Sequence, residues 1–277
     1  MIIISEKQAK DLLFYFNRKK DVIETSLNLG FTNSKIKIEN SAFVLPDGQR
    51  LSIDQLKKII KKDTICFRIE NNEIIPISVF SEDTNNYYKL VPAKDWPTIE
   101  ISGIRMHVTK TMSPKEDTVK KISFVSPCTG IVLDTCTGLG YTAIMAAKTA
   151  EIVHTFERDS NVIELEKINP WSTGLFENKK IIRHHEDVFF GIKKFEKNYF
   201  DRIIHDPPRQ ALSNMLYSQD FYNELFRVIK KSGKLFHYTG DPGSKRGLDI
   251  RAGIIKRLSN SGFVKIERVF NGLTAEK

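Results

Sequence analysis

Two different patterns of apolar and polar positions divide the chain. Up to about residue 95, short alternating runs such as KIKIEN, TICFRIE and NNYYKLVPA are typical of strands, and Asp47-Gly48 marks a hairpin turn. Two stretches with helical spacing, SEKQAKDLLFYF and SIDQLKKIIKK, begin at serines, which are favoured helix caps. Residues 1–95 are therefore predicted to form a small α+β domain.

Residues 96–125 are predicted to connect this domain to the rest of the chain. Prolines and Gly103 are expected to interrupt regular structure along most of the segment. Pro114 is placed to begin a helix, since proline is favoured at the first helical position.

From residue 126 to 277, apolar runs such as IVLD, EIVHTF and FDRIIHD alternate with helix-like stretches. Repeated strand–helix units predict a parallel sheet covered by helices on both faces. The helix through FYNELFRVIKKSG is predicted to end at Gly233, and the last two runs, FVKIERVF and LTAEK, to pair antiparallel. The predicted fold class is α/β: a Rossmann-like, doubly wound, mostly parallel sheet with an antiparallel terminal strand, preceded by a small α+β domain.

Composition narrows the functional classes. The 277 residues are 40% hydrophobic and 28% charged, which is ordinary for a globular protein. No apolar run approaches the roughly 18–20 residues that span a bilayer, and the apolar N-terminal stretch is too short for a signal peptide. We therefore expect no membrane association and a cytoplasmic location. The three cysteines lack CxxC spacing and the six histidines lack HExxH spacing, so neither a disulfide framework nor a metal site is predicted.

The charge balance favours an anionic partner. Lysine and arginine number 43 against 34 aspartate and glutamate, a net charge of +9. Such a surplus most often serves nucleic acid, and the alternative is a solvated lysine-rich surface.

A glycine-containing turn carries the first candidate chemistry. Asp134 ends the apolar run IVLD, and a G-x-G turn at Gly138 and Gly140 opens a helix. Glycine permits close approach of a ligand to the backbone. The spacing also fits a dinucleotide fingerprint, but a carboxylate at Asp134 would repel a pyrophosphate and suits a cationic group such as an amino acid ammonium.

Acidic residues follow the next two predicted strands. Glu157, followed by Arg158, lies 23 residues after Asp134 and can accept hydrogen bonds from ribose hydroxyls. An acid at this place also occurs in NAD enzymes, so Glu157 does not distinguish a dinucleotide from another ligand that contains ribose. Asp187 is the candidate at the third strand end, and Glu186 is the competing residue.

The fourth strand ends in His205-Asp206-Pro207-Pro208-Arg209. Two prolines fix φ and remove two backbone donors, which leaves carbonyl oxygens as acceptors. Asp206 and the Pro207 carbonyl could accept hydrogen bonds from an exocyclic amine and so direct its lone pair. The alternative is a rigid turn at the sheet edge.

These motifs resemble class I S-adenosylmethionine-dependent methyltransferases. The acidic strand end before G-x-G resembles their first motif, and Asp-Pro-Pro resembles the fourth motif of those that methylate amino groups of bases. Arg209 departs from the aromatic residue of that pattern. DTCTGLGYTA, HDPPR and SGIRMHVTKTMSP together also resemble archaeal methyltransferase-like proteins. The resemblance implies that Asp206, Pro207, Pro208 and Arg209 act on the acceptor, and that S-adenosyl-L-methionine is bound by Asp134, Thr135, Cys136, Thr137, Gly138, Gly140, Tyr141, Thr142, Glu157, Arg158, Asp187 and Val188.

The expected function is N-methylation of an exocyclic base amine in RNA, either tRNA or rRNA, or in DNA. The motif Asp-Pro-Pro-Arg also occurs in 5-methyluridine methyltransferases. Those enzymes need a nucleophilic cysteine downstream of the motif, and no cysteine follows Cys136 in this sequence. Two alternatives stay open. One is aminopropyl transfer to a polyamine on the same fold, which calls for an acidic pocket. The other is a catalytically inert, cofactor-binding subunit that binds RNA.

Overall fold

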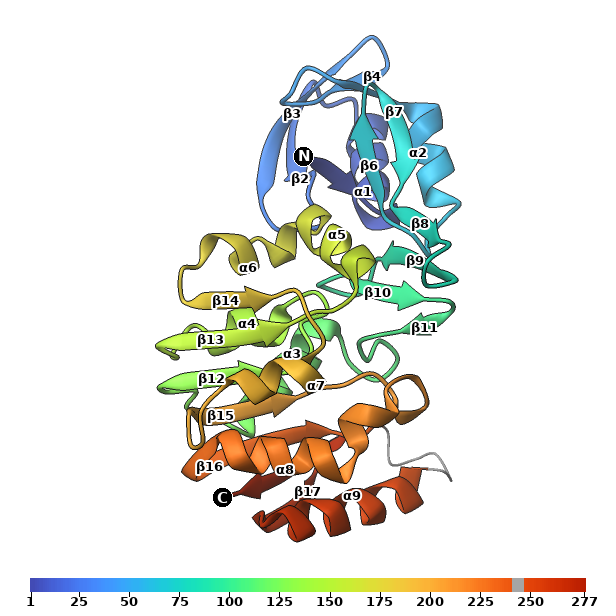
Figure 1. Cartoon of the computed structure of the whole chain (residues 1–277). Helices are drawn as coiled ribbons and strands as arrows, with labels where there is room; N and C mark the ends of the chain where they lie inside the picture. Colours follow the sequence, from blue (N-terminus) through green and yellow to red (C-terminus); the bar gives the residue numbers. More distant parts are fainter. Residues whose placement is uncertain (241–246) are drawn as a thin grey trace. The chain divides into compact units, whose positions relative to one another are not determined.

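The computed structural model describes residues 1–240 and 247–277, which form two compact units (Figure 1). Unit 1 consists of Met1–Lys115 with Glu164–Trp171, and unit 2 of Glu116–Ile163 with Ser172–Lys277. The segment 96–125 is thereby divided between the two units.

Unit 1 contains three small antiparallel sheets and two complete helices. The strand orders are β2-β3-β4-β5, β1-β6-β7 and β11-β10-β9-β8. Its elements are β1 (Ile2–Ile4), α1 (Glu6–Asn17), β2 (Val22–Ser26), β3 (Asn33–Glu39), β4 (Ala42–Val44), β5 (Arg50–Ser52), α2 (Ile53–Ile60), β6 (Phe67–Glu70), β7 (Glu73–Pro76), β8 (Ser78–Ser81), β9 (Asn86–Val91), β10 (Thr98–Ile101) and β11 (Ile104–Arg105).

Local sequence signals explain the helices of unit 1. Ser5 and Ser52 cap α1 and α2, each in a capping box with the glutamine three residues on. The two helices place Leu12 and Leu56 in one core with Phe43 of β4. The predicted Asp47-Gly48 turn joins β4 to β5.

The prediction of irregular structure after residue 96 was wrong for part of the segment. Strands β10 and β11 pair antiparallel around Ser102 and Gly103, whose φ angles are +45° and +84°. Positive φ at both central residues is the geometry of a tight hairpin turn, so Gly103 permits the hairpin rather than interrupting it. Helix α3 (Pro114–Ser123) begins at Pro114 as predicted.

Unit 2 is built on a seven-stranded sheet of order β14-β13-β12-β15-β16-β18-β17. The first five strands in this order, β14, β13, β12, β15 and β16, run parallel. Strand β18 is antiparallel to both of its neighbours, which confirms the predicted fold class. The further elements, of which α5 spans the division between the units, are β12 (Ile131–Asp134), α4 (Tyr141–Ala146), β13 (Ile152–Phe156), α5 (Ser160–Ile168), η1 (Pro170–Ser172), α6 (Gly174–Glu177), β14 (Ile181–His184), α7 (Val188–Gly191), η2 (Ile192–Lys194), β15 (Phe200–His205), η3 (Gln210–Leu212), η4 (Asn214–Tyr217), α8 (Gln219–Val228), β16 (Ile229–Tyr238), α9 (Gly247–Ser261), β17 (Val264–Val269) and β18 (Gly272–Glu276).

Neighbouring residues of a strand enter different cores. Val132 of β12 packs in a cluster with Ala143 of α4, whereas Leu133 packs in another with Leu225 of α8. Since successive side chains of a strand point to opposite faces, both faces of the sheet are covered.

The predicted end of the helix at Gly233 was wrong. Helix α8 ends at Val228, and Ile229 already pairs with Phe200 of β15. Both Ile229 and Phe200 are fully buried, so burial in the sheet overrides the helical pattern of the sequence at this point.

Candidate active site

The candidate residues meet at one edge of the sheet in unit 2. Asp134 ends β12, Glu157 follows β13, Asp187 comes three residues after β14, and Asp206 follows β15. These strands run parallel, so their carboxyl ends share one edge. The chain order reverses between β12 and β15, and such a switch point is where ligands bind in open α/β sheets.

Asp134 is completely buried beneath this edge. Its two carboxylate oxygens accept hydrogen bonds from the hydroxyls of Thr142, at 3.1 Å, and Thr155, at 2.7 Å. Burial raises the pKa of Asp134 to about 8, against the opposing effect of these two hydroxyls. The side chain ties the start of α4 to β13, and its contact with a ligand ammonium stays a prediction.

The glycine turn is held by backbone hydrogen bonds to both neighbouring strands. Thr135 N–H donates to the carbonyl of Ile204, and Thr137 N–H to that of Phe156. Gly138 has φ +55°, and the space that a Cβ would enter is open. At Gly140, with φ +76°, a Cβ would lie 2.2 Å from Leu175 Cδ1. Gly138 therefore leaves room for a ligand, whereas Gly140 is required by packing.

Glu157 lies beside the glycine turn. Its Oε2 accepts from Gly138 N–H at 3.1 Å and its Oε1 from Asp159 N–H at 3.0 Å. Burial raises the pKa of Glu157 to about 7, although the backbone donors of Asp159 and Gly138 oppose the shift. Each oxygen retains lone-pair capacity for a further donor, which fits ribose hydroxyls.

The residues of the next strand end are brought together as well. Arg158 Nη1 lies 2.9 Å from Asp187 Oδ2, and Asp187 Oδ1 accepts from Phe189 N–H at the start of α7. Val188 is buried, whereas the competing Glu186 pairs with Lys194.

The other predicted residues of the turn are mostly packed into the fold. Thr137 shares a hydroxyl hydrogen bond with Thr155, and Tyr141 and Thr142 are buried. Burial and the nearby Glu157 carboxylate raise the pKa of Cys136 well above its ordinary value. The thiol therefore stays protonated at neutral pH and is a poor nucleophile.

At the fourth strand end, Asp206 forms an ion pair that sequence reasoning missed. Its Oδ2 lies 2.7 Å from Nζ of Lys121 in α3, which lies equally close to Asp117. Pro207 is buried, the Pro208 carbonyl accepts from the Tyr217 hydroxyl at 3.0 Å, and Arg209 is exposed. The i, i+4 spacing of Asp117 and Lys121 was the available signal, but it did not indicate which strand the pair would meet.

His205 connects the fourth strand end with the glycine turn. Its Nε2 lies 3.0 Å from the carbonyl oxygen of Leu216 and its Nδ1 lies 2.8 Å from Thr135 Oγ1. A carbonyl can only accept, so we assign the proton to Nε2, and Nδ1 accepts from Thr135. Complete burial lowers the pKa of His205 to about 3, which keeps the ring neutral.

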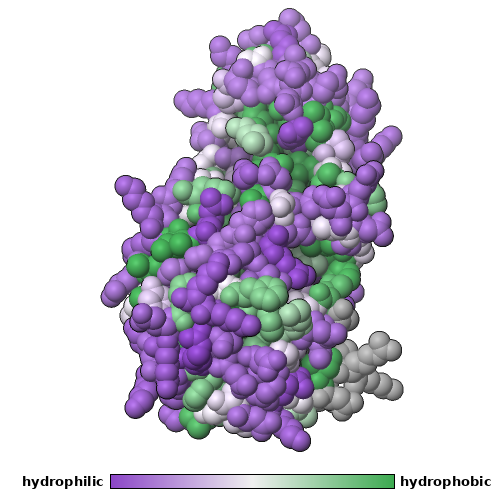
Figure 2. All heavy atoms as spheres, viewed as in Figure 1, coloured by the Kyte–Doolittle hydropathy of each residue, from purple (hydrophilic) through white to green (hydrophobic). Residues whose placement is uncertain are grey.

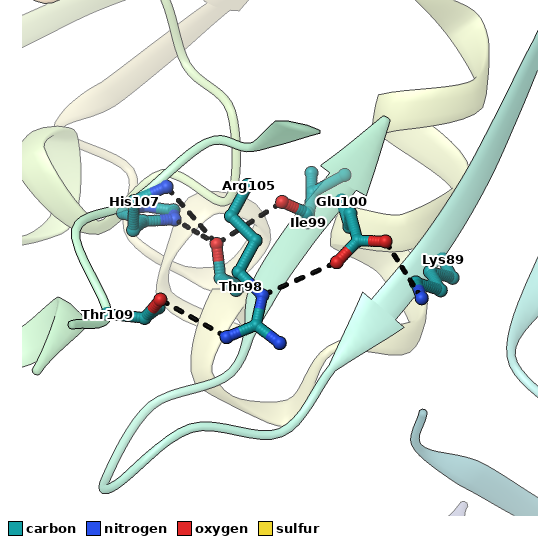
Figure 3. A network of polar contacts seen from close by, with 7 residues as sticks. All are labelled: Lys89, Thr98, Ile99, Glu100, Arg105, His107 and Thr109. Carbon is teal, nitrogen blue, oxygen red and sulfur yellow. Dashed lines mark hydrogen bonds and ion pairs between the residues drawn. The ribbon is translucent and has the colours of Figure 1, made fainter. Parts of the chain in front are cut away.

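Unit 1 has a polar network of a different kind (Figure 3). Thr98 Oγ1 lies 2.9 Å from His107 Nδ1, and Glu100 pairs with Lys89 at 2.8 Å and with Arg105 at 3.3 Å. These contacts tie β9, β10 and β11 to the segment that follows them.

Comparison with known proteins finds a relative that matches nearly the whole chain. No family model matches the sequence. The uncharacterized protein MJ1233 of Methanocaldococcus jannaschii is 45% identical over 280 aligned residues, which span 99% of this chain and 94% of that protein. The chain belongs to the family of MJ1233.

More distant matches concern only part of the chain or only the fold. A polyamine aminopropyltransferase of Prochlorococcus marinus is 30% identical over 128 residues, 44% of each chain. Spermidine synthase from Thermotoga maritima superimposes with a TM-score of 0.56 over 76% of this chain and 77% of that one, at 19% identity. That similarity shows a shared fold.

Within the described ranges, no helix combines the length and apolarity needed to cross a bilayer. Figure 2 shows a largely hydrophilic face with smaller apolar patches between the polar side chains.

Proposed function

We propose that this chain is a transferase that uses an S-adenosyl sulfonium donor to alkylate an amine nitrogen. The proposal depends on one juxtaposition: the open space at Gly138 lies beside Glu157, and Asp206 stands at the end of β15, the strand next to β12. A donor with ribose hydroxyls and an acceptor with an N–H would each find carboxylate oxygens there.

The donor half of the edge comprises the ends of β12, β13 and β14. Glu157 accepts hydrogen bonds from ribose hydroxyls, Asp187 lies where an adenine amino group would donate, and Gly138 lets the donor approach the backbone. The bound donor supplies an electrophilic carbon: the N–C bond forms as the S–C bond breaks, its electron pair goes to sulfur, and the nitrogen releases its proton to water.

The acceptor half comprises Asp206 and the Pro207 carbonyl. Both accept hydrogen bonds from an uncharged amine and so direct its lone pair toward the donor. Alignment of this kind supplies much of the rate in such a displacement. A neutral amine needs no strong base, so Asp206 orients the nitrogen rather than deprotonating it.

We assign methyl as the group transferred and a base amine in RNA as the acceptor. The net charge of +9 and the exposed guanidinium of Arg209 beside the Asp-Pro-Pro turn support this choice. S-adenosyl-L-methionine is then the donor.

Aminopropyl transfer to a polyamine is the second candidate. It is favoured by the partial match to polyamine aminopropyltransferases and by the carboxylates of Asp117, Asp134, Glu157 and Asp206 in one region, which suit a cationic acceptor. The donor would be decarboxylated S-adenosylmethionine.

Two labelled donors decide between the candidates. Methyl-labelled S-adenosylmethionine and aminopropyl-labelled decarboxylated S-adenosylmethionine are each incubated with tRNA, rRNA, DNA and putrescine. We expect methyl label in RNA, and about 100-fold slower labelling after Asp206→Ala. Aminopropyl label in putrescine would establish the second candidate instead. Absence of transfer from both donors, together with no donor binding by calorimetry, would contradict the proposal.

A further inference from the structure

A buried lysine stands behind the acid that the proposed function assigns to the acceptor. The Lys121 side chain is only 6% exposed, and its Nζ lies 2.7 Å from both Asp117 Oδ2 and Asp206 Oδ2. The same Nζ lies 4.5 Å from the centroid of the Tyr238 ring. The ammonium is thus enclosed by two carboxylates and an aromatic face.

Lys121 keeps its charge in this setting. Burial by itself lowers the pKa of a lysine, but the charges of Asp206 and Asp117 outweigh burial and hold the pKa of Lys121 above its ordinary value. Asp206 consequently faces a permanent cation, and this cation engages Oδ2.

Stability alone does not account for this cluster. Well-packed apolar side chains of similar volume are often as stable as a buried ion pair or more so. The cluster joins α3 to the end of β15 across 85 residues of sequence. It therefore fixes the carboxylate that ends β15 at the candidate site.

We propose that Lys121 is a positioning residue that acts through Asp206 and selects a neutral amine as acceptor. It holds Oδ2 of Asp206, so that Oδ1 and the Pro207 carbonyl accept from the incoming N–H. It also offsets part of the charge of Asp206, so that this carboxylate attracts an ammonium ion less strongly. The inference rests on the proposed function.

Turnover measurements on matched variants test the positioning role. Lys121→Met removes the charge and keeps a long side chain, and the control is Lys120→Met, the exposed neighbour whose Nζ lies over Phe270. We expect Lys121→Met to lower kcat about 100-fold with donor affinity unchanged, because misalignment acts on the chemical step. Lys121→Arg should restore part of the rate and Lys120→Met should behave as wild type. Full turnover by Lys121→Met would overturn the inference.

A double variant separates positioning from structural support. In an Asp206→Asn background, loss of Lys121 should cause no further loss of turnover, because the lysine acts through that carboxylate. The double variant also lacks the Asp206 charge, so loss of Lys121 leaves only Asp117 without its cation and the fold is less disturbed. A further large loss in the double variant would mean that Lys121 acts by another route.

A binding measurement needs no turnover. Lys121→Ala leaves a cavity that n-propylammonium can fill, and a bound cation between Asp117 and Asp206 stabilises the folded state. Propylammonium should raise the Tm of Lys121→Ala more than that of wild type, and n-propanol should not. If propylammonium raises the Tm of Lys121→Ala and of wild type equally, the site does not hold a cation. If wild type transfers no group to any acceptor while this rescue succeeds, the proposed function fails and the cation site stands.

Discussion

One carboxylate from each unit illustrates two opposite environments. In unit 1, Glu100 lies between Lys89 and Arg105 (Figure 3). Burial raises the pKa of Glu100, but the hydrogen bonds and charges of Lys89 and Arg105 outweigh burial, so the pKa lies below its ordinary value. In unit 2, Asp134 is completely buried with two hydroxyls as partners, and burial raises its pKa to about 8.

This difference supports placing the proposed chemistry in unit 2. Ion pairs like those of Glu100 fasten strands and contribute modestly to stability. Carboxylates that lose their solvation lower stability unless they are paired, so their clustering at one sheet edge is typical of functional sites. Changes at the edge in unit 2 should therefore affect binding or turnover, and changes in the unit 1 network should affect stability alone.

The largest effect is expected from Asp206→Ala. Loss of the acceptor-orienting carboxylate should lower turnover by about 100-fold or more, whereas calorimetry with S-adenosylhomocysteine should give an unchanged affinity. Asp220→Ala, at an exposed acid in the first turn of α8, is the matched control. Equal turnover by wild type and Asp206→Ala would make the Asp-Pro-Pro turn a structural feature only.

The two glycines of the turn should separate packing from binding. Gly140→Ala places a Cβ against Leu175 at positive φ and should lower the free energy of unfolding by about 2–4 kcal/mol. Gly138→Ala fills open space and should cost about 1–2 kcal/mol of backbone strain while weakening the binding of S-adenosylhomocysteine. Urea unfolding and calorimetry measure the two effects. Undiminished binding by Gly138→Ala would place the donor elsewhere.

Asp134 should make the free energy of unfolding depend on pH between its unfolded pKa of 3.8 and its folded pKa of about 8. Its pKa rises from 3.8 in the unfolded chain to about 8 in the folded one, so the folded state binds the extra proton between these values. Stability should therefore fall as pH rises toward 8. The buried His205, with a folded pKa of about 3, acts in the opposite direction but only below about pH 6.5.

Thermal unfolding between pH 6.5 and 8 measures this effect of Asp134 apart from the histidine. Asp134→Asn should flatten the decline, since the amide cannot ionise, and the part contributed by Glu157 should remain. An equal slope in wild type and variant would mean that Asp134 is already ionised in the folded protein.

The smallest effect is expected in unit 1. Glu100→Gln removes two ion pairs of a partly exposed network and should lower the free energy of unfolding by about 1 kcal/mol or less. Donor affinity should not change. A large loss of donor binding would remove the functional distinction between the units.

The sequence predicted the sheet edge well because parallel strands carry strong local signals. Asp134, Glu157 and Asp206 each follow an apolar run, and strand polarity alone brings such ends together. Lys121 was missed because it comes from a helix that precedes the sheet, and no local pattern specifies which strand end that helix meets. The hairpin at Gly103 and the start of β16 at Ile229 were missed for a related reason: partner strands, rather than local propensity, decide both.

The adjacency of β12 and β15 has a consequence for how the proposed activity could diversify. Thr135 N–H bonds to the Ile204 carbonyl, so the turn after β12 and the turn after β15 begin one strand spacing apart, about 4.8 Å. Under the proposed function, the backbone pairing of β12 with β15, rather than long side chains, sets the distance between donor and acceptor. Under the proposed function, segment 209–214 is the natural place to randomise for altered acceptor choice. Leu216 must be kept, because its carbonyl holds His205, which contacts Thr135 of the donor turn.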